Sequence, residues 1–177
     1  MVDYYPYLIP SLPMLHFGMK PPFSFERFLE ICRQFIPKPD YQLLCTLPRP
    51  QQYSEESKRY KTVRKWIEFD TAMKNELVKV RAQRKHIEPS PYLRPGISSD
   101  LSLAAAAMAA MSNPSLLDAE TVLEEIRWKS LEEIATGHHF DLDLLITYAY
   151  KLLILIRLEN IHNAHPATML EHILPNT

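Results

Sequence analysis

Glycine is scarce in this 177-residue sequence, which has only three, at positions 18, 96 and 137. Phosphate-binding loops, nucleophile elbows and dinucleotide-binding fingerprints all need glycines at fixed spacings, and none of these motifs is present. The sequence therefore predicts a non-catalytic protein, with no catalytic residue, no cofactor and no small-molecule substrate.

Cysteine is nearly absent too, with Cys32 and Cys45 alone. They lack the spacing and the companion ligands of a zinc site, so we expect two free, buried thiols. The sequence opens without the charged and apolar pattern of a secretory leader, which favours a cytoplasmic protein.

Seven histidines raise the question of a metal site. His162 and His165 have a helical ligand spacing, but Pro166 follows at once and no further ligand converges on them. We predict no metal site, and we expect His138 and His139 in a turn at the end of a helix, where a cation meets the negative end of the dipole.

The chain has no overall excess of charge, since its formal net charge is −1. Residues 54–86 nevertheless hold ten Lys or Arg against five Asp or Glu, whereas residues 116–161 hold four against nine. Three explanations stay open: pairing of these segments within the fold, a protein partner, or nucleic acid. The lack of a net positive charge makes nucleic acid the least favoured.

No uninterrupted membrane-length apolar run is present. The most apolar segment, from Leu142, contains four charged residues within about 20 positions. Because a central lysine costs several kcal/mol in lipid, we expect a buried core helix or a docking helix there.

Proline, in contrast, is plentiful, and its fifteen positions separate stretches of helical periodicity. The pattern predicts an all-α fold, an irregular bundle of about five helices with proline-rich connecting straps, forming a single domain over residues 1–177. Residues 1–23 are expected to be an extended strap without helix, because prolines 6, 10 and 13 remove backbone donors. The strap should lay five apolar or aromatic residues across the core: Tyr4, Tyr5, Tyr7, Leu8 and Ile9.

Helices are predicted over residues 24–36, with Ser24 as the N-cap, over residues 40–47, and from Ser54 to about residue 86. The first should bury Phe25, Phe28, Leu29, Cys32, Phe35 and Ile36. Residues 89–115 are expected to form a flexible loop with a short alanine-rich helix. A helix from Ser112 or Asn113 to Gly137 follows, then one capped by Asp141, with a further turn over residues 166–174.

The helix over residues 54–86 has two apolar faces. Trp66, Phe69, Met73, Leu77 and Val80 share a stripe at helical spacing and are predicted to face the core. A second, semi-apolar patch lies opposite, between basic flanks, where a wholly solvated face would not need Ile or Val. The candidate partner-binding residues are Ile67, Thr71, Lys74, Asn75, Val78 and Arg81.

Three stretches, "YYPYLIPSLP", "MKNELVKVRAQR" and "RWKSLEEIATGHHFDLDLLITYAYKLLILIRLENI", resemble a family of small uncharacterised bacterial proteins. Members of that family accompany V-type (A/V-type) ATPases and are similar in character to the C/d subunit, which joins the rotor axle to the membrane ring. The present chain is much shorter than a full C/d subunit.

Carried onto this sequence, the family's arginine-asparagine-glutamate-leucine pattern falls on residues 74–77, with a lysine in place of the first arginine and a matching arginine at position 81. A lysine lacks the planar, two-pronged guanidinium. The remaining matches are Arg127, Trp128, the turn from His138 to Phe140, Lys151, Leu152 and Arg157.

The resemblance implies a non-catalytic accessory or central-stalk component of a bacterial V-type ATPase. Its partners would be stalk and membrane-ring subunits, and it would lie in the cytoplasm, peripheral to the inner membrane through these partners only. The alternative is a small helical nucleic-acid-associated protein that uses the basic face of residues 54–86, around Arg64, Lys74, Lys79, Arg81, Arg84 and Lys85.

Overall fold

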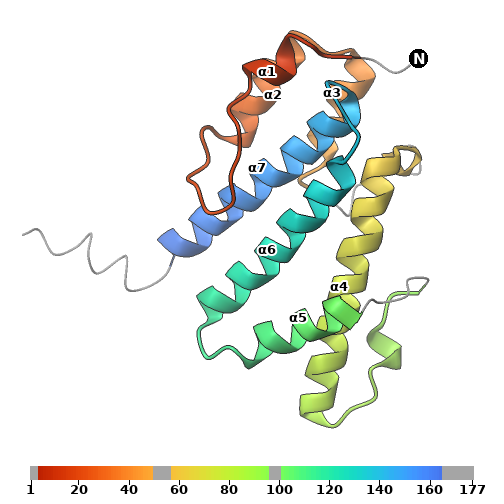
Figure 1. Ribbon diagram of the computed structural model, residues 1–177. Coiled ribbons are helices and arrows are strands. Elements are labelled where there is room, and N and C mark those ends of the chain that lie inside the picture. The colour runs from red at the N-terminus through yellow and green to blue at the C-terminus, as the bar shows by residue number, and fades with distance from the viewer. Residues whose placement is uncertain (1–3, 50–56, 96–100, 165–177) are drawn as a thin grey trace, which may run out of the picture.

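The computed structural model describes residues 4–49, 57–95 and 101–164. Within these residues the chain forms seven α-helices and no strand, with one isolated bridge between Tyr4 and Asp141 (Figure 1). The predicted all-α class is confirmed, although the helices outnumber the expected five. No helix in the described residues is long and apolar enough to cross a membrane.

The N-terminal strap is not fully extended, because α1 (Leu8–Ser11) adds one helical turn to it. The prediction that proline excludes a helix here is wrong for this turn. Pro10 lies in the first turn, where the backbone N–H groups have no helical partner, so its missing donor costs little. The strap buries Tyr5 and Leu8 but leaves Tyr4 and Tyr7 exposed.

Helices α2 (Phe25–Arg33) and α3 (Lys38–Thr46) follow the strap. The Ser24 hydroxyl accepts a hydrogen bond from the Arg27 N–H, as predicted for an N-cap. Helix α2 ends three residues earlier than expected, and for that reason Phe35 leaves the buried face and is exposed. Cys32 is buried as predicted, whereas Cys45 is exposed.

Helix α4 (Lys61–Lys85) is the longest and follows a short 3₁₀ turn, Ser57–Arg59. It ends at His86, whose left-handed backbone (φ 54°) turns the chain so that the Ile87 N–H donates to the Ala82 carbonyl at 3.0 Å. The predicted cap at Ser54 lies outside the described residues. A second 3₁₀ turn, Ser90–Tyr92, comes after α4.

The alanine-rich segment forms α5 (Leu101–Ser112), a full twelve-residue helix. Leu103, Ala107 and Ala110 face inward, and the last two form a small second core with Met73 and Leu77 of α4 and Leu123 of the next helix. Alanine lets the helices approach closely, so little side-chain bulk is needed for this packing. The flexibility expected for residues 89–115 stays a prediction.

Helices α6 (Leu116–Ala135) and α7 (Leu142–Asn163) pack side by side along much of their length (Figure 1). The N-cap of α6 is Ser115, two or three residues later than expected, because its hydroxyl accepts from the Asp118 N–H. Gly137 (φ +85°) follows the end of α6, and Asp141 caps α7 as predicted. The turn predicted over residues 166–174 lies outside the described residues.

The main core lies where α7 packs against α2, α3 and α6. Leu145, Ile146, Leu152 and Leu155 of α7 are almost completely buried in it. The apolar segment from Leu142 is therefore a core helix, as its internal charges indicated.

Candidate binding cavity

A cavity of about 340 Å³ opens where α4, α6 and α7 meet. Six of the candidate residues that the sequence singled out line it. They are Trp66, Ile67, Thr71, Lys74, Arg127 and Arg157. The other candidates lie outside its lining.

The apolar side of the cavity is built around an aromatic pair. The Trp66 ring of α4 lies 4.9 Å from the Tyr150 ring of α7, centroid to centroid, with an interplanar angle of 32°. Leu153 and Ile154 continue this wall along α7. Trp66 is only half-buried, since it packs against the main core and also lines the cavity.

The charged side begins with Asp70 of α4, whose carboxylate bridges two helices. Its Oδ2 lies 2.5 Å from Lys74 Nζ one turn along α4, and its Oδ1 lies 3.4 Å from Arg127 Nε on α6. All three side chains line the cavity. Asp70 therefore ties α4 to α6 at the edge of the opening.

A second carboxylate, Glu124 of α6, is almost completely buried and is shared by two arginines. Its Oε1 lies 2.9 Å from Arg127 Nη1 and 3.1 Å from Arg157 Nε of α7. Arg157 Nη2 also lies 3.0 Å from Glu120 Oε2. The network thus joins all three helices around the cavity.

Burial raises the pKa of Glu124 above its ordinary value, since removal from water disfavours the ionised form. The positive charges of Arg127 and Arg157 oppose this effect, and the negative charge of Glu120 adds to it. Desolvation is the largest of these influences, so the two arginines do not fully compensate the loss of water.

The remaining partner-binding candidates take different places. Asn75 is buried, and its amide makes two hydrogen bonds to the backbone of Arg94 in the segment after α4. Thr71 is buried as well and lines the cavity, and the partner-binding role expected of these two residues stays a prediction. Val78 is half-buried and Arg81 is exposed.

The residues carried over from the resemblance at the far end of α6 serve the contact between α6 and α7. Lys151 Nζ lies 4.8 Å above the centroid of the Trp128 ring, and the Trp128 indole donates to Glu132 Oε1 at 2.8 Å. Phe17 packs edge-on against the same ring, with centroids 5.7 Å apart. Trp128 is therefore a packing residue outside the cavity.

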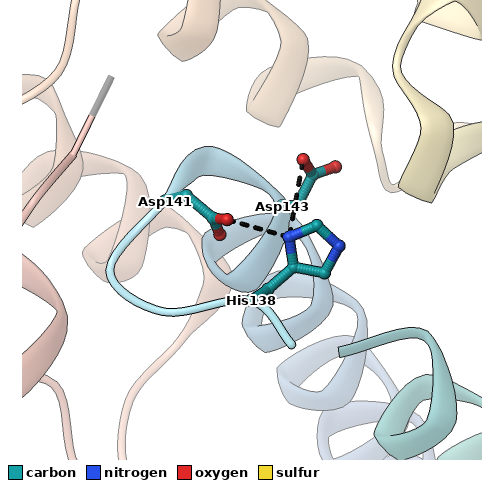
Figure 2. A group of neighbouring side chains, drawn as sticks. All are labelled: His138, Asp141 and Asp143. Carbon is teal, nitrogen blue, oxygen red and sulfur yellow. Dashed lines mark hydrogen bonds and ion pairs between the residues drawn. The ribbon is translucent and has the colours of Figure 1, made fainter. Parts of the chain in front are cut away.

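The turn between α6 and α7 brings together a group that the sequence did not predict. His138 Nδ1 lies 2.8 Å from Asp141 Oδ2 and 3.8 Å from Asp143 Oδ2 (Figure 2). The three ligand atoms lie close enough for a metal ion, within 4.8 Å of one another. Asp141 also caps α7 through Leu144 N–H, so its hydrogen bond to His138 has a structural role without an ion. Phe140 adopts a left-handed backbone in this turn, with φ 56°.

Sequence reasoning missed four charged residues of the cavity region. The links of Lys74 to Asp70 and of Arg127 to Glu124 follow i, i+4 and i, i+3 spacings, which the sequence could have suggested. Glu120 and Arg94 gave no such signal, because Arg157 and Asn75, the residues that engage them, lie far away along the chain.

Comparison with known proteins identified no relative of this chain. Searches against models of protein families, curated proteins and solved structures found no match to this chain.

Proposed function

We propose that this protein is a non-catalytic accessory or central-stalk component of a bacterial V-type ATPase and works by docking onto partner subunits. The resemblance described above suggests the partners. The observation that carries a docking role is the outer face of α5, which is apolar and exposed.

Helix α5 has no charged residue along its twelve positions. Its inner face packs in the second core, yet Leu101 is 89% exposed and Met108 is 56% exposed. Ala105 shares the outward side with them at i, i+4, i+7 spacing and is exposed too. A helix that is apolar all round is normally buried on both sides, so this face suits a partner.

The energetic gain from covering this face would be substantial. Burial of a Leu or Met side chain contributes about 1.5–3 kcal/mol relative to leaving it in water. Alanines on the same side would let a partner helix approach closely, and no charge on α5 would have to be desolvated.

The residues that carry the resemblance support the proposal indirectly. Arg127 and Arg157 hold the junction of α4, α6 and α7, and Trp128 and Lys151 hold the α6–α7 contact. Helix α5 packs on α4 and α6 next to this framework (Figure 1). We infer that the shared pattern maintains the framework on which the docking helix is presented.

Affinity purification from a bacterium that makes this protein tests the proposal. The tagged chain should bring down V-type ATPase stalk and membrane-ring subunits from gently solubilised membranes. Met108→Lys should weaken this recovery, because it places a charge on the apolar face, while Glu133→Lys on an exposed position of α6 should not. Purification without any ATPase subunit would contradict the proposal.

The nucleic-acid alternative draws little support from the arrangement of charges. Lys74 and Lys79 each pair with a carboxylate of their own helix, at 2.5 Å to Asp70 and 2.6 Å to Glu76. A phosphate-binding protein should lose affinity for DNA or RNA steeply between low and moderate salt. The docking proposal predicts no such affinity at either salt concentration.

A further inference from the structure

The cavity between α4, α6 and α7 carries an excess of positive charge. Four cationic side chains line it, those of Lys74, Arg94, Arg127 and Arg157, against the carboxylates of Asp70 and Glu124. We propose that this cavity binds a small organic anion, with a carboxylate or phosphate group at the arginines and an apolar body against the Trp66–Tyr150 wall.

Arg127 and Arg157 each have N–H donors that their ion pairs do not use. A guanidinium group carries five N–H donors. Arg157 engages its two carboxylates through Nε and Nη2, and Arg127 engages its own through Nε and Nη1. The same ion pairs fix both planar groups in place, so an incoming oxyanion meets donors that are already oriented.

Hydrogen bonds from Asn75 hold Arg94 at the cavity. The buried Asn75 amide donates to the Arg94 carbonyl oxygen at 2.9 Å and accepts from the Arg94 N–H at 3.0 Å. These bonds hold the segment after α4 by its backbone at Arg94, which lines the cavity. Asn75 is therefore a positioning residue for Arg94.

The apolar part of the lining suits an apolar or aromatic body. Trp66 and Tyr150 present ring surface, and Leu153 and Ile154 extend it. Ligand sites commonly combine such a wall with a few oriented polar groups, and the volume of about 340 Å³ lies at the lower end of their range. A small molecule fits this space, whereas a nucleic-acid strand does not.

The two tryptophans provide a built-in test, because Trp66 lines the cavity and Trp128 does not. Their indole N–H signals can be followed by NMR while phenylacetate, phenyl phosphate, inorganic phosphate or the neutral phenylacetamide is added. Either phenyl anion should shift the Trp66 signal and leave that of Trp128 in place, and the phenyl anion that binds tighter identifies the preferred acid group. Phenylacetamide and inorganic phosphate should each bind at least about tenfold more weakly than that anion, since each lacks one half of the recognition.

Arg94→Gln is the sharpest variant, because Arg94 is exposed and its bonds to Asn75 use only the backbone. It should weaken binding of the better phenyl anion by about tenfold, whereas Arg33→Gln, at the exposed end of α2 and outside the cavity lining, should change nothing. Equal affinities in these two variants would overturn the role of Arg94.

The remaining outcomes decide the proposal as a whole. No binding of either phenyl anion at about 10 mM, where even millimolar affinity would show, would overturn it. Equal shifts of both indole signals would also overturn it, because they would report surface association rather than occupation of the cavity. If phenylacetamide bound as tightly as the better phenyl anion, the negative charge would not be needed for binding. If inorganic phosphate bound as tightly as that anion, the apolar wall would not contribute to binding.

Discussion

The side-chain amide of Asn75 holds the backbone of Arg94 through two hydrogen bonds, nineteen residues apart in the sequence. One amide thereby satisfies both the N–H and the carbonyl of a residue in a segment without regular structure. This contact gives a structural role to Asn75, which the helical pattern had assigned to a partner-binding patch.

Asn75→Ala should leave the protein folded but lower its free energy of unfolding by about 1–3 kcal/mol, because the backbone groups of Arg94 lose their partners. Urea denaturation followed by circular dichroism measures the change. Gln83→Ala, at an exposed position of the same helix, should cost less than about 0.5 kcal/mol. Equal stabilities of the two variants would contradict the role given to the Asn75–Arg94 contact.

The two tryptophans should differ in what their removal costs. Trp128 is buried, with Phe17 and Lys151 packed on its ring, so Trp128→Ala should destabilise the fold by about 3–5 kcal/mol. Trp66 borders the cavity and is half-buried, so Trp66→Ala should cost only about 2 kcal/mol. Denaturation midpoints of both variants give the order, and a larger loss from Trp66→Ala would contradict the position of the cavity.

The buried carboxyl of Glu124 should give the fold a specific pH dependence. Its folded-state pKa is raised, so its contribution to stability is greatest below its ordinary value of 4.5 and is lost as the pH rises through the raised pKa. Glu124→Gln cannot ionise. The stability of this variant relative to the natural protein should therefore increase from pH 4 to pH 8 in urea denaturation. A relative decrease over that range would mean that Arg127 and Arg157 outweigh the desolvation.

The two thiols should react very differently with a thiol reagent such as Ellman's reagent. Burial raises the pKa of Cys32 to about 12, which leaves almost no thiolate at pH 8, whereas Cys45 is exposed. The native protein should release one equivalent of chromophore quickly, and a second only after denaturation. Fast labelling that persists in Cys45→Ser would contradict the burial of Cys32.

Much of the fold could be predicted from local patterns. The caps at Ser24 and Asp141 and the apolar stripe of α4 follow from rules that act within one or two helical turns. Errors arose where such rules compete, as at Pro10, which the first turn of a helix tolerates. Helix α5 is longer than its side-chain bulk suggested, because its alanines pack against neighbours that no local pattern reveals.

Only some of the residues that line the candidate cavity could be predicted from the sequence. Helical spacing singled out Trp66 and Ile67, and the resemblance added Arg127 and Arg157, but nothing indicated that these residues meet. Their meeting depends on how three helices pack, which side-chain periodicity along one helix does not specify. The coverage of Asn75 by a later segment depends on the same long-range arrangement.

The central claim, that the outer face of α5 docks onto V-type ATPase subunits, is tested most directly by site-specific photo-crosslinking in living cells. A photoreactive amino acid at position 108 should form a covalent adduct with a stalk or membrane-ring subunit of the ATPase. The same group at position 133, on an exposed part of α6, should not. Adducts with these subunits from position 133 but not from position 108, or no ATPase adduct from either position, would contradict the account.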